Sequence, residues 1–201
     1  LYRDVVYWFG PLTPYLQAAF LKAFGSGMGS LVVAGAVSAV LVLGVLFGVL
    51  RRVTGRVEAA LWTALAIPAL VFMPNAGGAI LGMGFRIWHA AAFSLLAIAV
   101  AAGEGRGASR TPGRIGGAGA LAGLAGLCRT EWGLAALSAV ALVLALRLRG
   151  RETVRAAAIL GAGFAAVFGG VWALFFVLAG GKAIVDQPIF PLQEFCYARL
   201  G

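Results

Sequence analysis

Residues 30–50 read SLVVAGAVSAVLVLGVLFGVL, a run with no charged side chain that ends at Arg51 and Arg52. A helix needs about 20 mostly apolar residues to cross the hydrocarbon core of a bilayer. The run meets that length, and the arginines that follow are typical of the point where a span leaves the bilayer. This stretch therefore predicts a membrane-spanning helix.

The composition of the whole chain agrees with a membrane setting. Of its 201 residues, 62% are hydrophobic and 11% are charged, and the mean hydropathy is +0.97. A soluble domain is about 45–50% apolar and about 25% charged, and it needs those polar residues to cover its outside. Lipid accepts an apolar exterior. We therefore predict an all-α, polytopic helical membrane protein whose environment is the lipid bilayer.

Further apolar stretches predict more spans, at Val57–Met73, Phe85–Gly103, Gly117–Leu146 and Ala156–Ala179. Within the third of these, Arg129-Thr130-Glu131 interrupts the run, and one straight span would bury charges at mid-membrane, which is costly. We predict instead two shorter helices that form a hairpin and meet at residues 128–132. The fold is then a bundle of about six membrane helices.

The basic residues orient these helices. Three loops hold Arg51, Arg52 and Arg56, then Arg106, Arg110 and Arg114, then Arg147, Arg149, Arg151 and Arg155. Because basic loops stay in the cytoplasm, the opposite face receives the hairpin tip and both ends of the chain. We expect a single transmembrane domain over 1–201: an extracytoplasmic loop at 1–29, helices over 30–179 and an extracytoplasmic amphipathic segment at 180–201. We also expect the chain to be a fragment of a longer membrane protein.

The net charge is +9, and the chain has two cysteines. How these residues are distributed argues against a nucleic-acid-binding protein and against a cysteine-ligated metal site. Such a charge would suggest a nucleic-acid partner in a soluble protein, but here the basic residues fall in short clusters between apolar runs. We therefore expect no nucleic-acid partner. Cys128 and Cys196 match no metal-ligand spacing. Buried or lipid-facing thiols are favoured, and the two would pair only if both faced an oxidising compartment.

The few polar residues that could carry chemistry are densest near the start of the chain. Asp4, beside Tyr7, could act as a general base or bind a divalent metal, and Arg3 could hold a phosphate. The alternative is an interfacial ion pair beneath an aromatic belt. Arg129 could bind a lipid phosphate while Glu131 holds the guanidinium, and the alternative is an ion pair that caps the hairpin.

One histidine, His89, lies near the start of a predicted span and close to Arg86. A lone histidine is more often a hydrogen-bonding group at a helix end than a catalyst. Arg86 could contact a phosphate from the same helix end.

Two stretches of this sequence resemble one family. The segment with YRD at 2–4, YWFGPL at 7–12, PYL at 14–16 and FG at 24–25 resembles the first large extracytoplasmic loop of GT-C glycosyltransferases. It is most similar to the bacterial cell-envelope and protein-mannosyltransferase-like group. The hairpin sequence LCRTEWGL at 127–134 resembles a later segment of the same group.

The resemblance implies a polyprenyl-phosphate-linked sugar as donor and a hydroxyl of a lipid, glycan or protein as acceptor, outside the cytoplasm. In the family, a carboxylate of the first loop activates the acceptor, and basic residues, sometimes with a metal, offset the charge on the leaving phosphate. The principal acidic residue usually lies further upstream, so Asp4 matches the second acidic position and the main base would precede Leu1. No cofactor is certain, and a divalent metal is the candidate. The residues expected to bind donor phosphate or substrate are Arg3, Arg129, Glu131, Arg86, His89 and Tyr7.

Two other classes stay open beside a glycosyltransferase of the bacterial plasma (inner) membrane. One is a secondary transporter or permease, in which a broken helix and a buried Arg–Glu pair would line a substrate path. The other is a non-catalytic membrane subunit. A transporter predicts interrupted spans in both halves of the chain, whereas this sequence interrupts one. We expect the fragment by itself to be inactive.

Overall fold

The computed structural model describes residues 10–71, 85–103 and 111–179. These residues form helices, and the described part contains no strand, which confirms the all-α prediction for it. The elements are α1 (Leu12–Phe24), α2 (Met28–Val53), α3 (Arg56–Val71), α4 (Phe85–Ala102), α5 (Pro112–Cys128), α6 (Thr130–Arg147), α7 (Arg151–Phe164), the π-helical turn η3 (Ala165–Gly169) and α8 (Gly170–Ala179).

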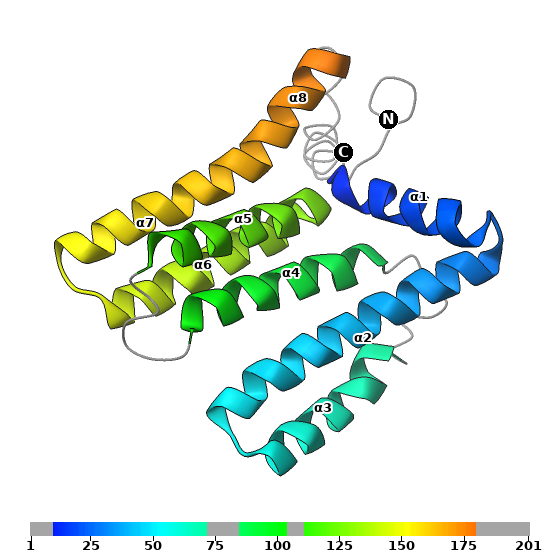
Figure 1. Cartoon of the computed structure of the whole chain (residues 1–201), viewed down its shortest axis with the longest axis horizontal. Coiled ribbons are helices and arrows are strands. Elements are labelled where there is room, and N and C mark those ends of the chain that lie inside the picture. The colour runs from blue at the N-terminus through cyan, green and yellow to red at the C-terminus, as the bar shows by residue number, and fades with distance from the viewer. Residues whose placement is uncertain (1–9, 72–84, 104–110, 180–201) are drawn as a thin grey trace, which may run out of the picture.

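Helix α5 is the centre of the bundle. It packs against α4, α6 and α7, and the start of α1 reaches its far end (Figure 1). Its sequence is mostly glycine and alanine, with Ile115 and Leu127 as its large buried side chains. Because small residues let backbones approach closely, this helix can be surrounded by others without large side chains keeping them apart.

Helices α5 and α7 approach each other closely. A Cβ added at Gly119 would lie 2.1 Å from the carbonyl oxygen of Leu160, and one added at Gly163 would lie 2.2 Å from that of Gly116. On the next turn of α5, a Cβ at Gly123 would lie 3.1 Å from the carbonyl oxygen of Phe164. The glycines at positions 119, 123 and 163 therefore allow the backbones of α5 and α7 to pack closely.

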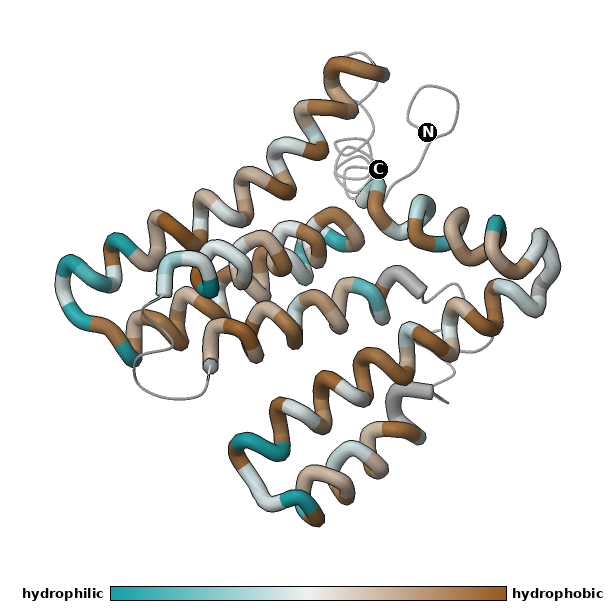
Figure 2. Tube along the Cα trace, in the orientation of Figure 1, coloured by the Kyte–Doolittle hydropathy of each residue, from teal (hydrophilic) through white to brown (hydrophobic). Residues whose placement is uncertain are grey.

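Within the described residues, three helices are long and apolar enough to cross a membrane: Gly29–Val53, Thr130–Arg147 and the continuous run Arg151–Leu178. Ile87–Ala102 is a shorter apolar helix. In the most hydrophobic stretch of the last long helix only 6% of the residues are buried inside the structure, and Figure 2 shows many brown, hydrophobic residues along it. A surface of this kind needs lipid around it, so the chain is a helical membrane protein.

The helix bounds refine the sequence prediction in three places. Residues 12–24, expected within an extracytoplasmic loop, form helix α1. Helix α5 begins at Pro112, inside the segment expected as a loop, because proline suits the first position of a helix, where no N–H is needed. Helix α6 has 18 residues and is long enough to span by itself, rather than being a short arm of the hairpin.

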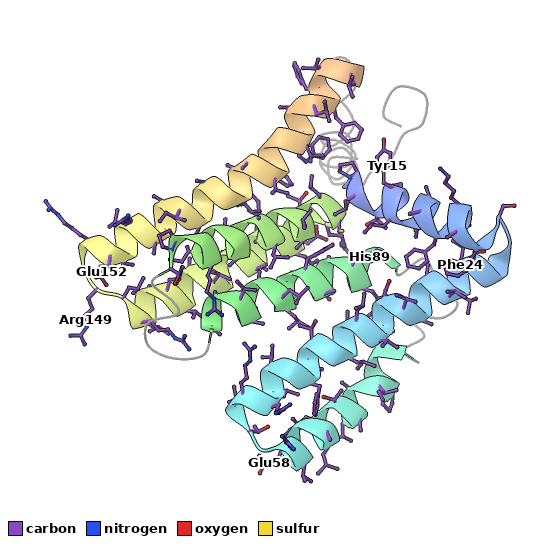
Figure 3. The ribbon with its side chains drawn as sticks, viewed as in Figure 1. Tyr15, Phe24, Glu58, His89, Arg149 and Glu152 are labelled. Atoms are coloured by element: carbon purple, nitrogen blue, oxygen red, sulfur yellow. The ribbon has the colours of Figure 1, made fainter. Side chains whose placement is uncertain are left out.

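The arginine-rich turns gather at one end of the bundle, which we call the basic end. It holds the turns between α2 and α3 and between α6 and α7, and Figure 3 labels Glu58, Arg149 and Glu152 there. Arg52 Nη1 donates to the carbonyl oxygen of Ala99 at 3.1 Å, and Arg147 Nη1 donates to that of Ala102. Both arginines thus meet the last carbonyls of α4, where the helix dipole favours a cation.

The opposite end, which we call the α1 end, is formed by α1, the starts of α2 and α4, and the turn between α5 and α6 (Figures 1 and 3). Helix α1 contacts α2, α4 and α5, so it lies across the ends of the other helices. Two of the predicted basic loops, between α2 and α3 and between α6 and α7, therefore lie at the opposite end of the described bundle from the hairpin tip, as predicted; residues 104–110 of the remaining loop lie outside the described residues.

Candidate functional site

The predicted site residues divide by whether the structure describes them. Arg3, Asp4 and Tyr7 lie outside the described residues, as does Cys196. Arg86 belongs to the first turn of α4, but its side chain is not among those described. The remaining predicted residues are described, and they are His89 in α4, Arg129 between α5 and α6, and Glu131 in α6.

The start of α1 is seated on the last turn of α5. Gly10 is buried, and a Cβ added there would lie 1.9 Å from the carbonyl oxygen of Leu127 and 2.4 Å from its carbonyl carbon. Pro11 and Thr13 are also fully buried. Only glycine fits this contact, because any side chain would overlap backbone atoms that cannot rotate away. Two segments far apart in the sequence are thereby held together at the α1 end.

We expect Gly10→Ala to lift α1 off α5, because its methyl group would overlap the Leu127 carbonyl. Cys128, which is fully buried at this contact, should then react with a maleimide at least several-fold faster than in the wild type. The measurement is the labelling rate in a Cys196→Ser background. Gly29→Ala is the control, since a Cβ there meets no atom within 4 Å. Equal labelling rates in the wild type and Gly10→Ala would contradict this seating of α1.

Arg129 forms the break between α5 and α6. Its backbone is extended, with φ −151° and ψ 120°, so it ends one helix and starts the next. Its N–H donates to Ala125 O at 2.8 Å, and its own carbonyl oxygen accepts from Trp132 N at 3.1 Å and Gly133 N at 3.2 Å. The break predicted between residues 128 and 132 is confirmed. The hydrogen bonds at this break are made by the backbone N–H and carbonyl groups of Arg129. The side chain of Arg129 is therefore available for another role.

The side chain of Arg129 pairs with Glu131 through Nη2 and Oε1. The arginine side chain is 29% exposed and the glutamate side chain 58%. Arg129 Nε is buried and has no hydrogen-bond partner among the described residues. A guanidinium carries five N–H donors, so one carboxylate leaves donors unused. The group is therefore a partly shielded cation, oriented by Glu131, with capacity for an anion such as a phosphate.

Beneath α1, Thr13 and Cys128 face each other, and both are fully buried. The thiol lies beside the Thr13 hydroxyl, yet Thr13 Oγ1 has no partner of standard hydrogen-bond geometry within the described ranges. Burial of Cys128 was one of the two environments predicted for it. These two residues lie in the contact between α1 and the end of α5, and Arg129 follows Cys128 directly in the sequence.

His89 lies in the interface between α2 and α4, where it forms a hydrogen bond with Ser38. Its side chain is 8% exposed, and Nε2 lies 2.9 Å from Ser38 Oγ. The Ser38 hydroxyl donates its one hydrogen to Ala34 O at 2.8 Å, so it accepts from His89, and we assign the ring proton to Nε2. His89 Nδ1 has no partner in the described part of the chain. The imidazole therefore packs as a helix-end hydrogen bonder, and only Nδ1 remains for any ligand.

Two contacts at the α1 end were not foreseen from the sequence. Tyr15 of α1 meets Phe175 of α8, with ring centroids 6.1 Å apart, and Ser94 of α4 donates to Trp132 O at 3.5 Å. The first contact joins α8 to α1, and the second joins α4 to the first turn of α6, next to Arg129. The aromatic richness of residues 1–25 was visible in the sequence, but it does not reveal which ring each would meet.

The described residues hold no group of three or more His, Cys, Asp or Glu side chains close enough for a metal ion. The divalent metal remains a prediction, and its candidate ligand Asp4 lies outside the described residues.

Comparisons of the sequence and the structure with known proteins find no match. A scan against models of protein families finds no family that matches the chain, and searches of curated proteins and of solved structures find no similar chain.

Proposed function

We propose that this chain is part of a GT-C-type membrane glycosyltransferase. It moves a sugar from a polyprenyl-phosphate donor to a hydroxyl of a lipid, glycan or protein acceptor on the extracytoplasmic side. In this proposal the bundle crosses a bacterial inner membrane about six times, with the basic end in the cytoplasm. The α1 end then faces the extracytoplasmic side, where the transfer takes place.

One observation carries the proposal. The two stretches that resemble the family, at 2–25 and 127–134, contact each other: Gly10 is seated on Leu127, and Arg129 follows directly. The resemblance was found in each stretch separately, and nothing in the sequence required the two to meet. Their contact supports a shared role at the α1 end, beside the half-buried cation of Arg129.

The proposed reaction uses this cation as a counter-charge. The acceptor oxygen bonds to the anomeric carbon and loses its proton to a carboxylate, while the bond from that carbon to the phosphate oxygen breaks. The phosphate leaves with the electron pair, and Arg129, held by Glu131, offsets its growing charge. Asp4 is a candidate for the carboxylate or its neighbour, and Arg3, Tyr7, Arg86 and His89 are candidates for substrate contacts.

The experiment is a transfer assay on the protein in its native membrane vesicles, supplied with a labelled polyprenyl-phosphate sugar and a hydroxyl-bearing lipid acceptor. A glycosyltransferase releases polyprenyl phosphate and labels the acceptor in equal amounts. A transporter instead accumulates unchanged substrate across the vesicle membrane. Accumulation without cleavage of the donor would contradict the proposed function.

A further inference from the structure

A cavity of about 110 Å³ lies at the basic end, far from the α1 end and its proposed chemistry. It forms where the start of α5, the residue after α6 and the first turns of α7 meet. Its apolar walls include Ile115, Leu148 and Ile159, and its charged lining residues are Glu152 and Arg155. A cavity with aliphatic walls and a cation suits a ligand that is itself partly apolar and partly anionic.

The electrostatic surroundings of the cavity favour an anion. Residues 147–155 contain four arginines and one acidic residue, Glu152, which Figure 3 shows at this end beside Arg149. Helices α5 and α7 both begin here, and their N-cap residues, Thr111 and Gly150, make no side-chain cap hydrogen bond. Helix N-termini carry partial positive charge, so both helices add to the field of the arginines.

We propose that this cavity binds the glycerophosphate of an anionic phospholipid. Arg155 contacts the phosphate, and Ile115, Leu148 and Ile159 receive the glycerol and the first carbons of an acyl chain. A basic pocket between membrane helices is suited to such headgroups, and the cytoplasmic leaflet, which this end is predicted to face, carries anionic lipid. A free phosphate ion would gain nothing from three aliphatic walls, so the lining favours a lipid over an inorganic anion.

The test compares thermal unfolding of the chain in nanodiscs of phosphatidylcholine alone and with increasing phosphatidylglycerol. The wild type should be stabilised by phosphatidylglycerol, and Arg155→Gln should need about fivefold more of it for the same shift, as expected for one basic residue at a membrane surface. Arg56→Gln is the matched control, because Arg56 lies at the same basic end but does not line the cavity. It should respond like the wild type.

Two further measurements test the cavity and the choice of ligand separately. Ala156, a buried lining residue, can be changed to leucine to fill the cavity, and this variant should keep its stability in phosphatidylcholine while losing the phosphatidylglycerol effect. Inorganic phosphate at the same concentration should have no effect on the wild type. Equal weakening in Arg155→Gln and Arg56→Gln would reduce the effect to general surface charge and overturn the site. Full stabilisation by inorganic phosphate alone would overturn the choice of lipid.

Discussion

Replacing Gly163 by alanine is expected to cost this protein about 1–3 kcal/mol of stability or more, as overpacking of a tight interior does. The same change at its near neighbour Gly161 should leave stability unchanged or slightly higher. Both glycines belong to α7, so the helix propensity gained by alanine, up to about 1 kcal/mol, is shared. The difference between the two variants therefore isolates the packing of α7 on α5.

The physical reason is the backbone contact between these helices. A Cβ at Gly163 would lie 2.2 Å from the carbonyl oxygen of Gly116 and 3.0 Å from its carbonyl carbon, whereas a Cβ at Gly161 meets nothing within 4 Å. A flexible side chain could move aside, but a helix backbone cannot do so alone. Relief requires α7 to move away from α5, which also opens the reciprocal contact of Gly119 with Leu160.

The measurement is thermal unfolding of both variants in the same nanodiscs, with helix content as the readout. Gly163→Ala should unfold at a clearly lower temperature than the wild type, and Gly161→Ala at the wild-type temperature or above. Equal unfolding temperatures for the two variants would mean that α5 and α7 do not approach as closely as described.

The largest expected effect on activity is at Arg129. If its guanidinium offsets the charge of the leaving phosphate, Arg129→Ala should lower sugar transfer about 100-fold or more, as loss of a charge-stabilising donor does. Arg129→Lys should recover part of this loss, because it keeps the charge without the forked geometry of arginine. Arg149→Ala, an exposed arginine at the basic end, is the control and should transfer at the wild-type rate.

The backbone of Arg129 makes this variant interpretable. The hydrogen bonds that end α5 and start α6 come from its N–H and carbonyl groups, which alanine retains. The protein should therefore still insert into the membrane, and Cys128 should stay unreactive toward a maleimide. Normal transfer by a folded Arg129→Ala protein would assign the Arg129–Glu131 pair to capping the hairpin.

Long apolar runs allowed most of the helices to be predicted. Helices α2 and α4 lie close to their predicted ranges, and the charged pair inside residues 117–146 correctly located the break at Arg129. Helix α1 was missed because residues 12–24 contain polar residues and Pro14, and Pro11 directly precedes them, a composition that also suits a loop. Pro14 is tolerated in the helix because it lies in the first turn, where the N–H groups have no partner within the helix.

The candidate site was less predictable, because it depends on contacts between distant segments. Local spacing was enough to suggest that Glu131 pairs with Arg129. The seating of Gly10 on Leu127 follows from how α1 crosses the bundle, which periodicity does not encode. The partner of His89 is Ser38 on another helix, and the lone histidine showed only that some hydrogen bond was expected. The cavity at the basic end is lined by α5, α7 and Leu148 after α6, so no single segment of the sequence predicts it.

The central claim is that α1 and the α5–α6 turn share one extracytoplasmic face, opposite the basic end. Single cysteines at Lys22, Thr130 and Arg149, all exposed, test it in a Cys128→Ala and Cys196→Ser background. On intact cells, a membrane-impermeant maleimide should label positions 22 and 130, and position 149 only after the membrane is permeabilised. Labelling of 22 and 130 from opposite sides, or of 149 together with them on intact cells, would contradict the claim.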